Sequence, residues 1–449
     1  MGGSLTGRRV TLSRRGLLAL GLFAALPGHA WALPRRPVGG KVSLRVPFSL
    51  SQVDPHRSHD MAAAIIGGAL FDTLFEQGEA GAVLPSLAEG EPEPEGANLR
   101  ITLREGLRTG NGKPIDLRDV LFSLSRSRDA GGRVWLSDVP APKLDGRSLL
   151  FATRDAKALL RALSSPLTAI VARDFNPDRP DGTGPFRVGS KDPSSLVLMR
   201  NAAAARGPGL LSEITLRAST SLDASLRAFE GGQDDIGWLG QGLYGTRPGS
   251  RAFDAGPVAY AVLQTGADAS PWDVPGVAQR VASSIPHAKV ASFGLGAAWP
   301  QETDDGWGGP ATTLLVREDN PWLVELGRSV AALISRPSHE VVAKPVGPAE
   351  LSQRRAARTF GLLLDVVRPF ALGGLGAHAA LLAYEDQNRG TELIKRPPKS
   401  DVPLRAALRG TRTGLLGEVH VQGGVMADLQ LPMSPALPGI DWALSFRKR

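Results

Sequence analysis

Residues 54–60 gather side chains that could bind a metal ion, with two carboxylates and two imidazoles in one short stretch. The four candidates are Asp54, His56, His59 and Asp60. A metal site with two histidines three residues apart usually lies on a regular helix and recruits a further ligand from elsewhere. Here a proline and several polar residues favour a loop, and Asp60 is placed to cap the helix that follows. The sequence therefore favours a polar loop and a helix N-cap, with a metal site as the alternative.

Enzyme signatures are missing from the sequence. It has no nucleophile elbow, no zinc-binding His-Glu-x-x-His, no phosphate-binding loop and no dinucleotide fingerprint. The absence of cysteine excludes disulfides, thiol catalysis, thiolate metal sites and lipid attachment through an N-terminal cysteine. Asp304 and Asp305 favour a solvated turn, because a calcium loop needs oxygen ligands at alternating positions. We therefore expect neither an enzyme nor a cofactor, with a hydrolase as a remote alternative because catalytic triads are defined by geometry.

The best candidates for a ligand site are aromatic residues in two loops rich in glycine or proline. Trp238 and Tyr244 lie in the first loop, directly after a predicted strand, and Trp299 and Trp307 lie in the second. Trp and Tyr side chains combine a flat apolar surface with one polar group, which suits the wall of a ligand cleft. Glycine-rich loops build little core, so we expect these side chains to line a cleft, with burial in the core as the alternative for each tryptophan.

The first 32 residues are typical of an export signal. Residues 13–18 read SRRGLL, a twin-arginine pattern, and the apolar segment over 16–26 is too short to span a bilayer. Residues 30–32 read AWA, the small-x-small pattern that signal peptidase recognises, so we predict a twin-arginine signal peptide cleaved after Ala32. Residues 33–40 then form a tether, and the mature protein is expected in the periplasm. A buried N-terminal helix is the alternative.

The charge of the chain does not indicate nucleic-acid binding. The formal charge is +8, with 52 basic and 44 acidic residues, but four of the arginines lie in the first 32 residues, which hold no acidic residue. The other basic residues are spread along the chain and form no stripe interleaved with aromatics, which nucleic-acid binding would need. The balance of 42% hydrophobic and 21% charged residues predicts a soluble globular protein for the rest of the chain.

The elements that position these residues follow from hydrophobic periodicity. Alternating apolar residues in the first half predict strands at 42–46, 99–103, 148–153, 196–200 and 214–218. Helices are predicted after the N-caps Asp60 and Asp116, and a third helix includes residues 222–229. Gly182 and Gly184 bracket a turn before a strand at Phe186, where we expect a positive φ that only glycine adopts at low cost.

The second half alternates strictly between strands and helices. Strands are predicted at 312–316, 339–344 and 360–366, and helices at 321–335 and 348–358, with Trp322 on the apolar face of its helix. Strands separated by helices of this length form right-handed βαβ units and a parallel sheet. The second half is therefore expected to form its own α/β lobe. Two further strand-like runs follow at 416–421 and 442–446.

Several motifs between residues 42 and 265 resemble those of the family 5 solute-binding proteins, the oligopeptide-, dipeptide- and nickel-binding type. Residues 84–89 (LPSLAE), 103–108 (LREGLR), 111–115 (NGKPI) and 119–124 (DVLFSL) resemble that family's signature segment. Similar motifs precede and follow it at 53–56 (VDPH), 69–74 (ALFDTL), 182–186 (GTGPF) and 230–236 (EGGQDDI). The resemblance is weaker from 265 to 365 and vague beyond that.

The resemblance implies an α/β protein with the two-lobed periplasmic-binding-protein fold of type II, with an extra subdomain in lobe one. Lobe one is expected over 41–262, with the inserted subdomain at about 60–180. Lobe two is expected over 263–400, and residues 401–449 return to lobe one. The chain is shorter than the resemblance implies, and the missing length falls in lobe two.

The resemblance also implies the periplasmic solute-binding component of an ABC importer. Such a protein captures a small molecule, peptide-like or another polar solute, between its lobes and delivers it to the membrane permease subunits. We expect a monomer that binds no nucleic acid. The alternative is a protein of the same fold that senses or scaffolds in the periplasm without a transporter.

One departure from the family concerns the peptide-binding residues. The family's peptide binders carry an acidic residue, in an A-D-Y-x-[DE]-P stretch, that holds the amino group of the peptide. The corresponding residues 365–371 read DVVRPFA, so the carboxylate comes early and Arg368 stands nearby. Arg368 is therefore a further candidate for ligand contact, and we expect weak or no binding of general di- and oligopeptides.

Overall fold

The structure is a computed structural model that describes residues 36–78, 81–219, 221–238, 247–296, 306–371, 373–398, 406, 408–433 and 439–448. The predicted signal peptide and the cleavage site at Ala32 lie outside these residues. Residues 37–449 group into one unit by their contacts. Within the described ranges, no helix is long and apolar enough to cross a membrane.

One sheet of 11 strands runs through the whole fold. Its strands are β1 (Lys41–Val46), β8 (Phe186–Asp192), β9 (Ser195–Arg200), β10 (Glu213–Ala218), β11 (Ile236–Trp238), β12 (Ser250–Thr265), β13 (Leu295–Gly296), β14 (Thr312–Arg317), β15 (Val341–Val346), β16 (Leu362–Val367) and β17 (Thr413–Met426). Their order is β15-β14-β16-β12-β17-β11-β1-β10-β9-β8, with β13 paired to β17 outside this path.

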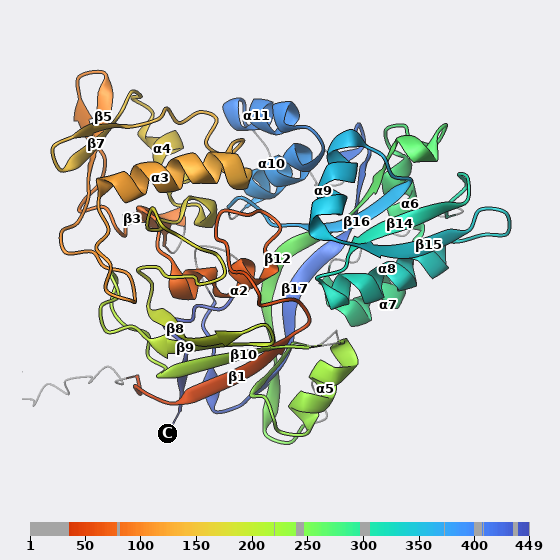
Figure 1. The fold of residues 1–449 in the computed structure, drawn as a ribbon, viewed down its shortest axis with the longest axis horizontal. Helices are drawn as coiled ribbons and strands as arrows, with labels where there is room; N and C mark the ends of the chain where they lie inside the picture. The colour runs from red at the N-terminus through yellow and green to blue at the C-terminus, as the bar shows by residue number, and fades with distance from the viewer. Residues whose placement is uncertain are drawn as a thin grey trace, which may run out of the picture. The chain divides into compact units, whose positions relative to one another are not determined.

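The two long strands β12 and β17 connect the two lobes. They pair antiparallel along most of their length, from Ser250 opposite Met426 to Gln264 opposite Thr413. Figure 1 shows them running from β1 and β10 at one end to β14 and β16 at the other. The expected lobe boundary at residue 262 falls inside β12, at a shift in register between Ala261 and Val262.

Lobe one is built on the predicted first strand. β1 pairs in parallel with β10 and β11, and β8, β9 and β10 are antiparallel neighbours. Val42, Leu44 and Val46 are buried and alternate with more exposed residues, which confirms the strand predicted from period-two hydrophobicity. The helices α2 (Met61–Leu70) and α5 (Leu222–Glu230) belong to this lobe, and the short pair β18 (Leu429–Gln430) and β19 (Phe446–Arg447) closes it.

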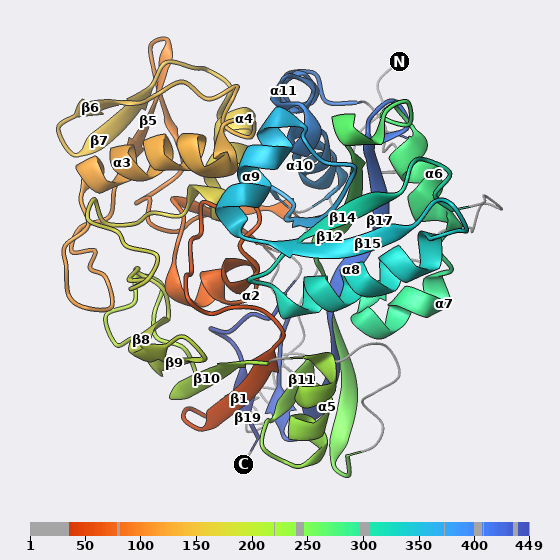
Figure 2. The ribbon, with the colours of Figure 1, turned by 45° about the vertical axis from the view of Figure 1, so that its right-hand side comes forward.

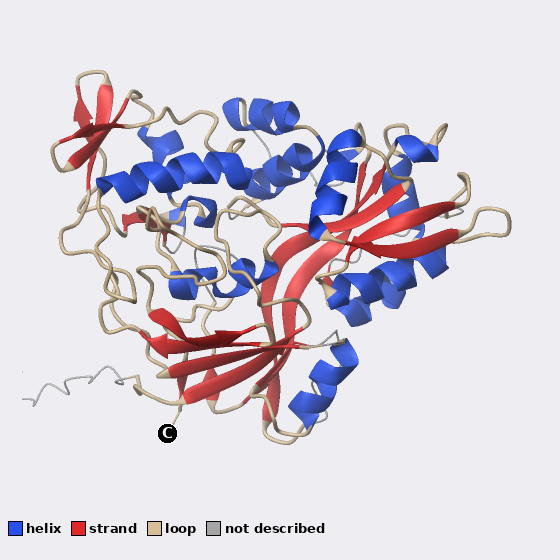
Figure 3. Ribbon diagram, in the orientation of Figure 1, coloured by secondary structure: helices blue, strands red, loops and turns tan. Residues whose placement is uncertain are grey.

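The inserted subdomain has its own sheet, set apart from the main sheet in Figure 3. Its strands β4 (Glu93–Glu95), β5 (Asn98–Thr102), β7 (Ser148–Phe151) and β6 (Lys143–Asp145) are adjacent in that order. The other elements of this region are the hairpin β2 (Phe75–Gln77) and β3 (Val83–Pro85), the helices α3 (Leu117–Ser127) and α4 (Ala156–Leu163), and a short 3₁₀ turn at Pro166–Thr168. A π-helical turn at Arg128–Gly132 continues α3.

Lobe two contains the predicted parallel sheet. β14 pairs in parallel with β15 and with β16, which confirms the βαβ units expected from the sequence. The helices α8 (Pro321–Ile334) and α9 (Pro348–Ala357) cover opposite faces of these strands (Figure 2). The remaining helices are α6 (Val277–Ser284), α7 (His287–Val290), α10 (Gly374–Glu385) and α11 (Gln387–Lys395), and two 3₁₀ turns lie at Ala267–Ala269 and Ala291–Phe293.

The predicted helix caps are confirmed. The Asp60 carboxylate accepts a hydrogen bond from the Ala63 backbone N–H at 2.8 Å, which satisfies a donor that the first turn of α2 leaves open. Asp116 accepts from the Arg118 N–H at 2.7 Å, and the Asp119 carboxylate accepts from the Asp116 N–H at 2.8 Å. This reciprocal capping box fixes the start of α3.

The turn at 182–184 uses its glycines for a different reason from the one expected. Neither Gly182 nor Gly184 has a positive φ. Instead, the Gly184 N–H donates to the Leu70 carbonyl at 3.0 Å, so the turn lies against the end of α2. A Cβ on Gly184 would come within 2.6 Å of the Leu70 carbonyl carbon. Glycine is required here because two backbones approach closely.

The prediction of a strand at 442–446 is also wrong, because the strand in this segment is limited to Phe446–Arg447. The Asp441 carboxylate accepts a hydrogen bond from the Leu444 N–H at 3.2 Å, and its backbone carbonyl accepts one from the Ser445 hydroxyl at 2.7 Å. These two bonds hold a turn. Trp442 is 2% exposed, and its indole N–H donates to the Ile65 carbonyl at 2.8 Å. The apolar residues of this segment therefore anchor a turn to α2 instead of alternating along a strand.

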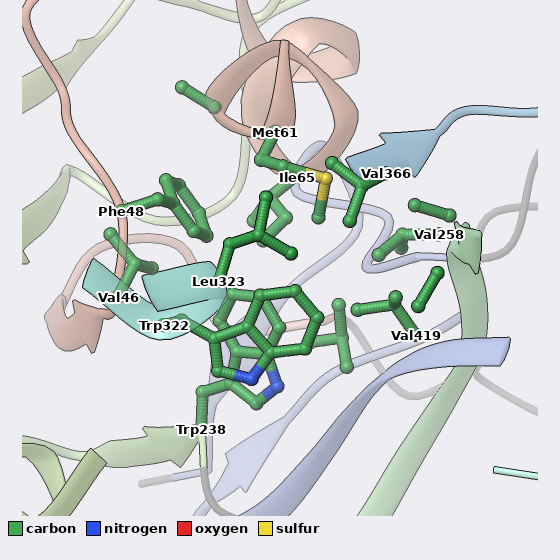
Figure 4. Packing of buried hydrophobic residues seen from close by; sticks show 14 of the residues in the cluster. Val46, Phe48, Met61, Ile65, Trp238, Val258, Trp322, Leu323, Val366 and Val419 are labelled. Atoms are coloured by element: carbon green, nitrogen blue, oxygen red, sulfur yellow. The ribbon is translucent and has the colours of Figure 1, made fainter. Parts of the chain in front are cut away.

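Two large apolar cores each contain residues of both lobes. The first joins the end of β1, α2 and Trp238 with the start of α8 and β16, and Figure 4 shows Phe48, Met61, Trp322 and Leu323 close together in it. The second joins the inserted subdomain with Phe370 and with α10 and α11. A third, small core of Leu315, Val346, Leu351, Phe360 and Leu363 belongs to lobe two alone.

Candidate functional site

A cavity of about 580 Å³ lies where the inserted subdomain, lobe two and the crossing strands meet. Its lining includes Ser58 and His59 before α2, Arg128 and Val134 of the subdomain, Gln264 and Arg412 of the crossing segments, and Arg355, Val367, Phe370 and Tyr384 of lobe two. Val367 ends β16, and ligand sites in α/β sheets commonly lie at the carboxyl ends of parallel strands. The volume is in the ordinary range for a small-molecule site.

Positive side chains dominate the charges around the cavity. Five arginines and two carboxylates line it, namely Arg128, Arg133, Arg355, Arg358 and Arg412 with Asp129 and Glu385. Three of these arginines have acidic partners. Arg133 contacts Asp129 at 3.5 Å, Arg412 contacts Asp273 at 3.1 Å, and Arg358 also forms an ion pair with Asp273.

Arg128 comes from the π-helical turn and has no acidic partner. Its guanidinium donates to the Val139 carbonyl at 2.9 Å and to the Leu124 carbonyl at 3.4 Å. Among the described residues it forms no ion pair, and burial lowers its pKa from the ordinary value. The side chain is therefore a half-buried cation held by neutral carbonyl groups.

Arg355 enters from α9 and lies over the Tyr384 ring, with its guanidinium carbon 4.3 Å from the ring centroid. The Tyr384 hydroxyl donates to the Asp365 carboxylate at 2.7 Å. Burial by itself lowers the pKa of Arg355, but Tyr384 and the nearby Asp365 outweigh it and leave that pKa above its ordinary value. Burial, followed by Asp365, raises the pKa of Tyr384 well above its ordinary value, so the phenol stays neutral.

The loop before α2 carries Ser58 and His59 into the cavity. Arg126 fixes this loop through a bidentate contact with Asp54, at 2.8 and 2.6 Å. Burial by itself raises the pKa of Asp54, and the Arg126 guanidinium outweighs it and holds the pKa below its ordinary value. Gly131 adopts a φ of 149°, and a Cβ there would lie 3.3 Å from the His56 carbonyl oxygen. The π-helical turn can therefore approach the loop closely.

The metal-site alternative for this loop does not fit the hydrogen bonds of its histidine. His56 donates from Nε2 to the Ala169 carbonyl at 2.8 Å and accepts from Arg126 at Nδ1 at 2.9 Å. Both ring nitrogens are thus used, and burial lowers the pKa of His56 to about 4. Asp60 is engaged as the N-cap. Across the described residues, no group of three or more candidate metal ligands comes together.

His59 separates the main cavity from a smaller one of about 70 Å³, which Arg57, Arg317 and Asp319 help to line. Burial, and then the positive charge of Arg317, lowers the pKa of His59 to about 4. The imidazole is therefore neutral near pH 7. It adds hydrogen-bonding capacity to the cavity wall without adding to its positive charge.

The site residues predicted from the sequence do not line the cavity, as far as the structure describes them. Trp238 is 2% exposed in the first core, where its indole N–H donates to the His420 carbonyl at 3.0 Å. Trp307 is fully buried and donates to the Pro310 carbonyl at 2.8 Å. Neither lines the two cavities described above. Tyr244 and Trp299, like Asp304 and Asp305, lie outside the described residues.

Arg368 lies beside the cavity but points into the protein. It is 3% exposed and donates to the Arg57 carbonyl at 3.0 Å, while its backbone N–H donates to the Ser58 carbonyl at 2.9 Å. Burial lowers its pKa from the ordinary value. Arg368 therefore holds the loop that carries Ser58 and His59, and does not itself form the cavity wall.

Reasoning from the sequence missed Arg128, Arg355 and Tyr384. The sequence does carry one signal, since Arg128 and Arg133 flank two glycines directly after an amphipathic helix. That spacing marks a turn with charged flanks, but the chain has 52 basic residues, and nothing in the sequence singles these two out. Only the tertiary contacts show which arginines lack a carboxylate.

Comparison with known proteins shows which family part of this chain is similar to. Residues 82–243 match the family model described as bacterial extracellular solute-binding proteins, family 5 middle. The nickel-binding protein NikA of Staphylococcus aureus is 24% identical over 204 residues, which are 44% of this chain and 41% of that relative. The sequence match therefore spans less than half the length of the relative.

Solved structures extend the likeness to the whole fold. The oligopeptide-binding protein AppA from Bacillus subtilis, in complex with a nonapeptide, has a TM-score of 0.67 and 14% identity over 92% of this chain and 100% of that chain. AgaA from A. tumefaciens R10, in complex with agropinic acid, has a TM-score of 0.68 and 15% identity over 91% of this chain and 99% of that chain.

The family match and the shared fold agree with the motifs at 84–124 and with the two crossing strands. Residues 82–243 are thus similar to the family 5 extracellular solute-binding proteins, and the chain has the two-lobed α/β fold of solved proteins such as AppA.

Proposed function

We propose that this protein is the periplasmic solute-binding component of an ABC importer. The observation that carries the proposal is the cavity of about 580 Å³, whose wall combines both lobes, the subdomain and the crossing strands. A site assembled from parts that can move relative to each other suits capture by hinge closure. The reaction is reversible binding, with no bond made or broken, followed by delivery of the solute to permease subunits.

The proposed solute is a small polar molecule. The cavity wall mixes apolar residues such as Val134, Val367 and Phe370 with guanidinium, hydroxyl and amide groups, as is usual for sites that bind small organic ligands. Proteins of this fold have been solved with a nonapeptide and with agropinic acid, so the fold itself accommodates different ligands. A peptide held by its amino group is disfavoured, because Asp365 already accepts from Tyr384.

The cellular part of the proposal follows from the N-terminal sequence and the family. We propose export by the twin-arginine route with cleavage after Ala32, and function as a monomer in the periplasm. Replacing Arg14 and Arg15 by lysine should leave the full-length chain in the cytoplasm, as seen by fractionation and mass spectrometry of the N-terminus. Periplasmic protein that still begins after Ala32 in this variant would contradict the route.

The binding proposal is tested on protein purified without denaturation from the periplasm of its native cell. Native mass spectrometry should show a bound molecule of small mass that is released on unfolding and can then be identified. Uptake of that molecule, isotopically labelled, should fall in cells that lack the gene and return when it is restored. Binding without any change in uptake would favour the second candidate function.

The second candidate is a periplasmic sensing or scaffold protein of the same fold that serves no transporter. Contacts between the lobes favour this second candidate. The Trp322 backbone N–H of lobe two donates to the Pro47 carbonyl of lobe one at 3.1 Å. Met61 and Leu323, also from different lobes, share one apolar core (Figure 4). Opening the lobes would expose this core, which limits the motion that delivery requires.

Solution scattering distinguishes the two candidates. A transport component should show a larger radius of gyration after its solute is removed by unfolding and refolding, and a smaller one when the solute is added back. A radius of gyration that stays constant in both conditions would favour the sensing or scaffold protein.

A further inference from the structure

We propose that the solute of this cavity is an organic anion, whose carboxylate or phosphate group binds between Arg128 and Arg355. This inference rests on the proposed function and names the chemical class of the ligand. Arg128 comes from the subdomain and Arg355 from α9 of lobe two, so the two guanidinium groups approach the same cavity from different parts of the fold.

The absence of an ion pair distinguishes these two side chains from several other half-buried arginines. Arg126 is paired with Asp54, Arg206 with Asp72, and Arg317 with Asp319. Among the described residues, Arg128 and Arg355 form no ion pair with a carboxylate. Arg128 is a partly buried cation without an acidic partner, which lowers the stability of the empty protein and makes it a candidate for ligand binding. Arg355 has Asp365 nearby but forms no ion pair with it, so its guanidinium is also a candidate.

The geometry of Arg355 suits an anion that binds and leaves. The Tyr384 ring lies under its guanidinium at 4.3 Å, and Tyr384 is in turn held by Asp365. The stacked ring restricts the orientation of the guanidinium, and a guanidinium edge offers the paired donors that match carboxylate and phosphate oxygens. The orientation is thus fixed before the ligand arrives, which reduces the entropy lost on binding.

The acidic residues of the cavity are already engaged and leave little for a cationic ligand. The Glu385 carboxylate accepts from the Arg412 N–H at 2.7 Å and from the Thr413 hydroxyl at 2.9 Å. Asp129 is exposed and contacts Arg133. The cavity thus offers partners for a negative group and few for an amine, which explains why an anion is favoured over a peptide N-terminus.

The rest of the wall indicates an organic body on the anion. Val134, Val367, Phe370 and Ala380 line the same cavity, and apolar side chains gain nothing from a bare inorganic ion. Citrate and inorganic phosphate are nevertheless useful probes, because each supplies one of the two anionic groups in a simple form.

The test measures the melting temperature of purified, ligand-free protein with citrate, with phosphate and with sodium chloride at equal ionic strength. Arg128→Gln and Arg355→Gln remove one guanidinium each, and Arg118→Gln removes an exposed arginine of α3 as a charge-matched control. Wild type and Arg118→Gln should be stabilised more by citrate or phosphate than by chloride. Each cavity variant should lose at least half of that extra shift, and the double variant all of it. A larger effect of citrate indicates a carboxylate, and a larger effect of phosphate indicates a phosphate.

A second readout uses no probe at all. In chloride alone, Arg128→Gln should melt at the same temperature as wild type or above it, because a charge without an acidic partner is removed. Arg355→Gln should melt lower, because Tyr384 and the nearby Asp365 favour its charged form. Arg206→Gln should melt lower, because it leaves the buried Asp72 without its partner. A double variant that keeps the whole anion-dependent shift, or wild-type protein that shows none, overturns the inference. A neutral or cationic molecule found in the purified protein overturns it too, while leaving the proposed solute-binding function intact.

Discussion

Single residues near the loop before α2 couple the stability of this protein to pH. His56 is buried and His59 is half-buried, and both are neutral in the folded protein, with pKa values lowered to about 4. Arg126 faces His56, while Arg317 and Arg355 face His59, so protonation would add charge beside existing cations. In the unfolded chain each histidine titrates near its ordinary pKa of about 6.5.

The free energy of unfolding should therefore fall as the pH decreases from 6.5 to 4 and stay nearly level just above 6.5. In that window the unfolded state binds protons that the folded state excludes, so stability is lost on acidification. At pH 5 the loss is on the order of 2 kcal/mol for each histidine. Urea denaturation at a series of pH values measures it. The double variant His56→Gln, His59→Gln should show a shallower slope, and an unchanged slope would show that other groups control this window.

Trp238 shows how a residue suited to a ligand cleft can serve the core. Trp238→Ala should lower the free energy of unfolding by about 3–5 kcal/mol, because it empties a buried site beside Phe48 and leaves the His420 carbonyl without its donor. Trp238→Phe should lose less, since it keeps a ring. Urea denaturation gives both values, and calorimetry gives solute binding by the folded variants. If Trp238→Ala has normal stability but no longer binds the solute, the prediction is wrong and Trp238 contacts the ligand.

At the scale of elements, the turn at 182–184 connects the end of α2 to the start of β8. Gly184→Ala should lower the free energy of unfolding by about 1–3 kcal/mol, because the new methyl group meets the backbone of Leu70, which cannot rotate away. Gly90→Ala is the matched control, since a Cβ there has nothing within 4 Å. Thermal and urea unfolding compare the two variants, and equal stability would contradict the close approach.

At the scale of the whole molecule, the shared cores predict that both lobes unfold together. Leu323→Ala in the first core should weaken hydrogen-exchange protection equally in β1 of lobe one and β14 of lobe two, by about 2–5 kcal/mol. Leu351→Ala is the control, because its core lies within lobe two. Loss of protection confined to one lobe in Leu323→Ala would show that the lobes are independent units.

The elements of this fold could be predicted from the sequence because their signals are local. The alternation of Val42, Leu44 and Val46, the cap at Asp116 and the proline at the start of α8 each act within a few residues. The family motifs at 84–124 likewise lie in one continuous stretch, and they indicated the fold. Trp322, expected in the core from the face of its helix, is 2% exposed. The segment at 442–446 shows the limit, since its apolar residues fitted a strand but fold into a turn.

The sequence by itself determined the fold class, the βαβ order of lobe two and the helix caps. Only the tertiary structure decided which residues form the cavity, because its wall joins Ser58 to Arg412 across most of the chain. No local pattern tells Arg128, which lacks a carboxylate, from Arg126 two residues earlier, which meets Asp54. The charge state and accessibility of a side chain depend on what folding brings beside it, and that is a property of distant segments.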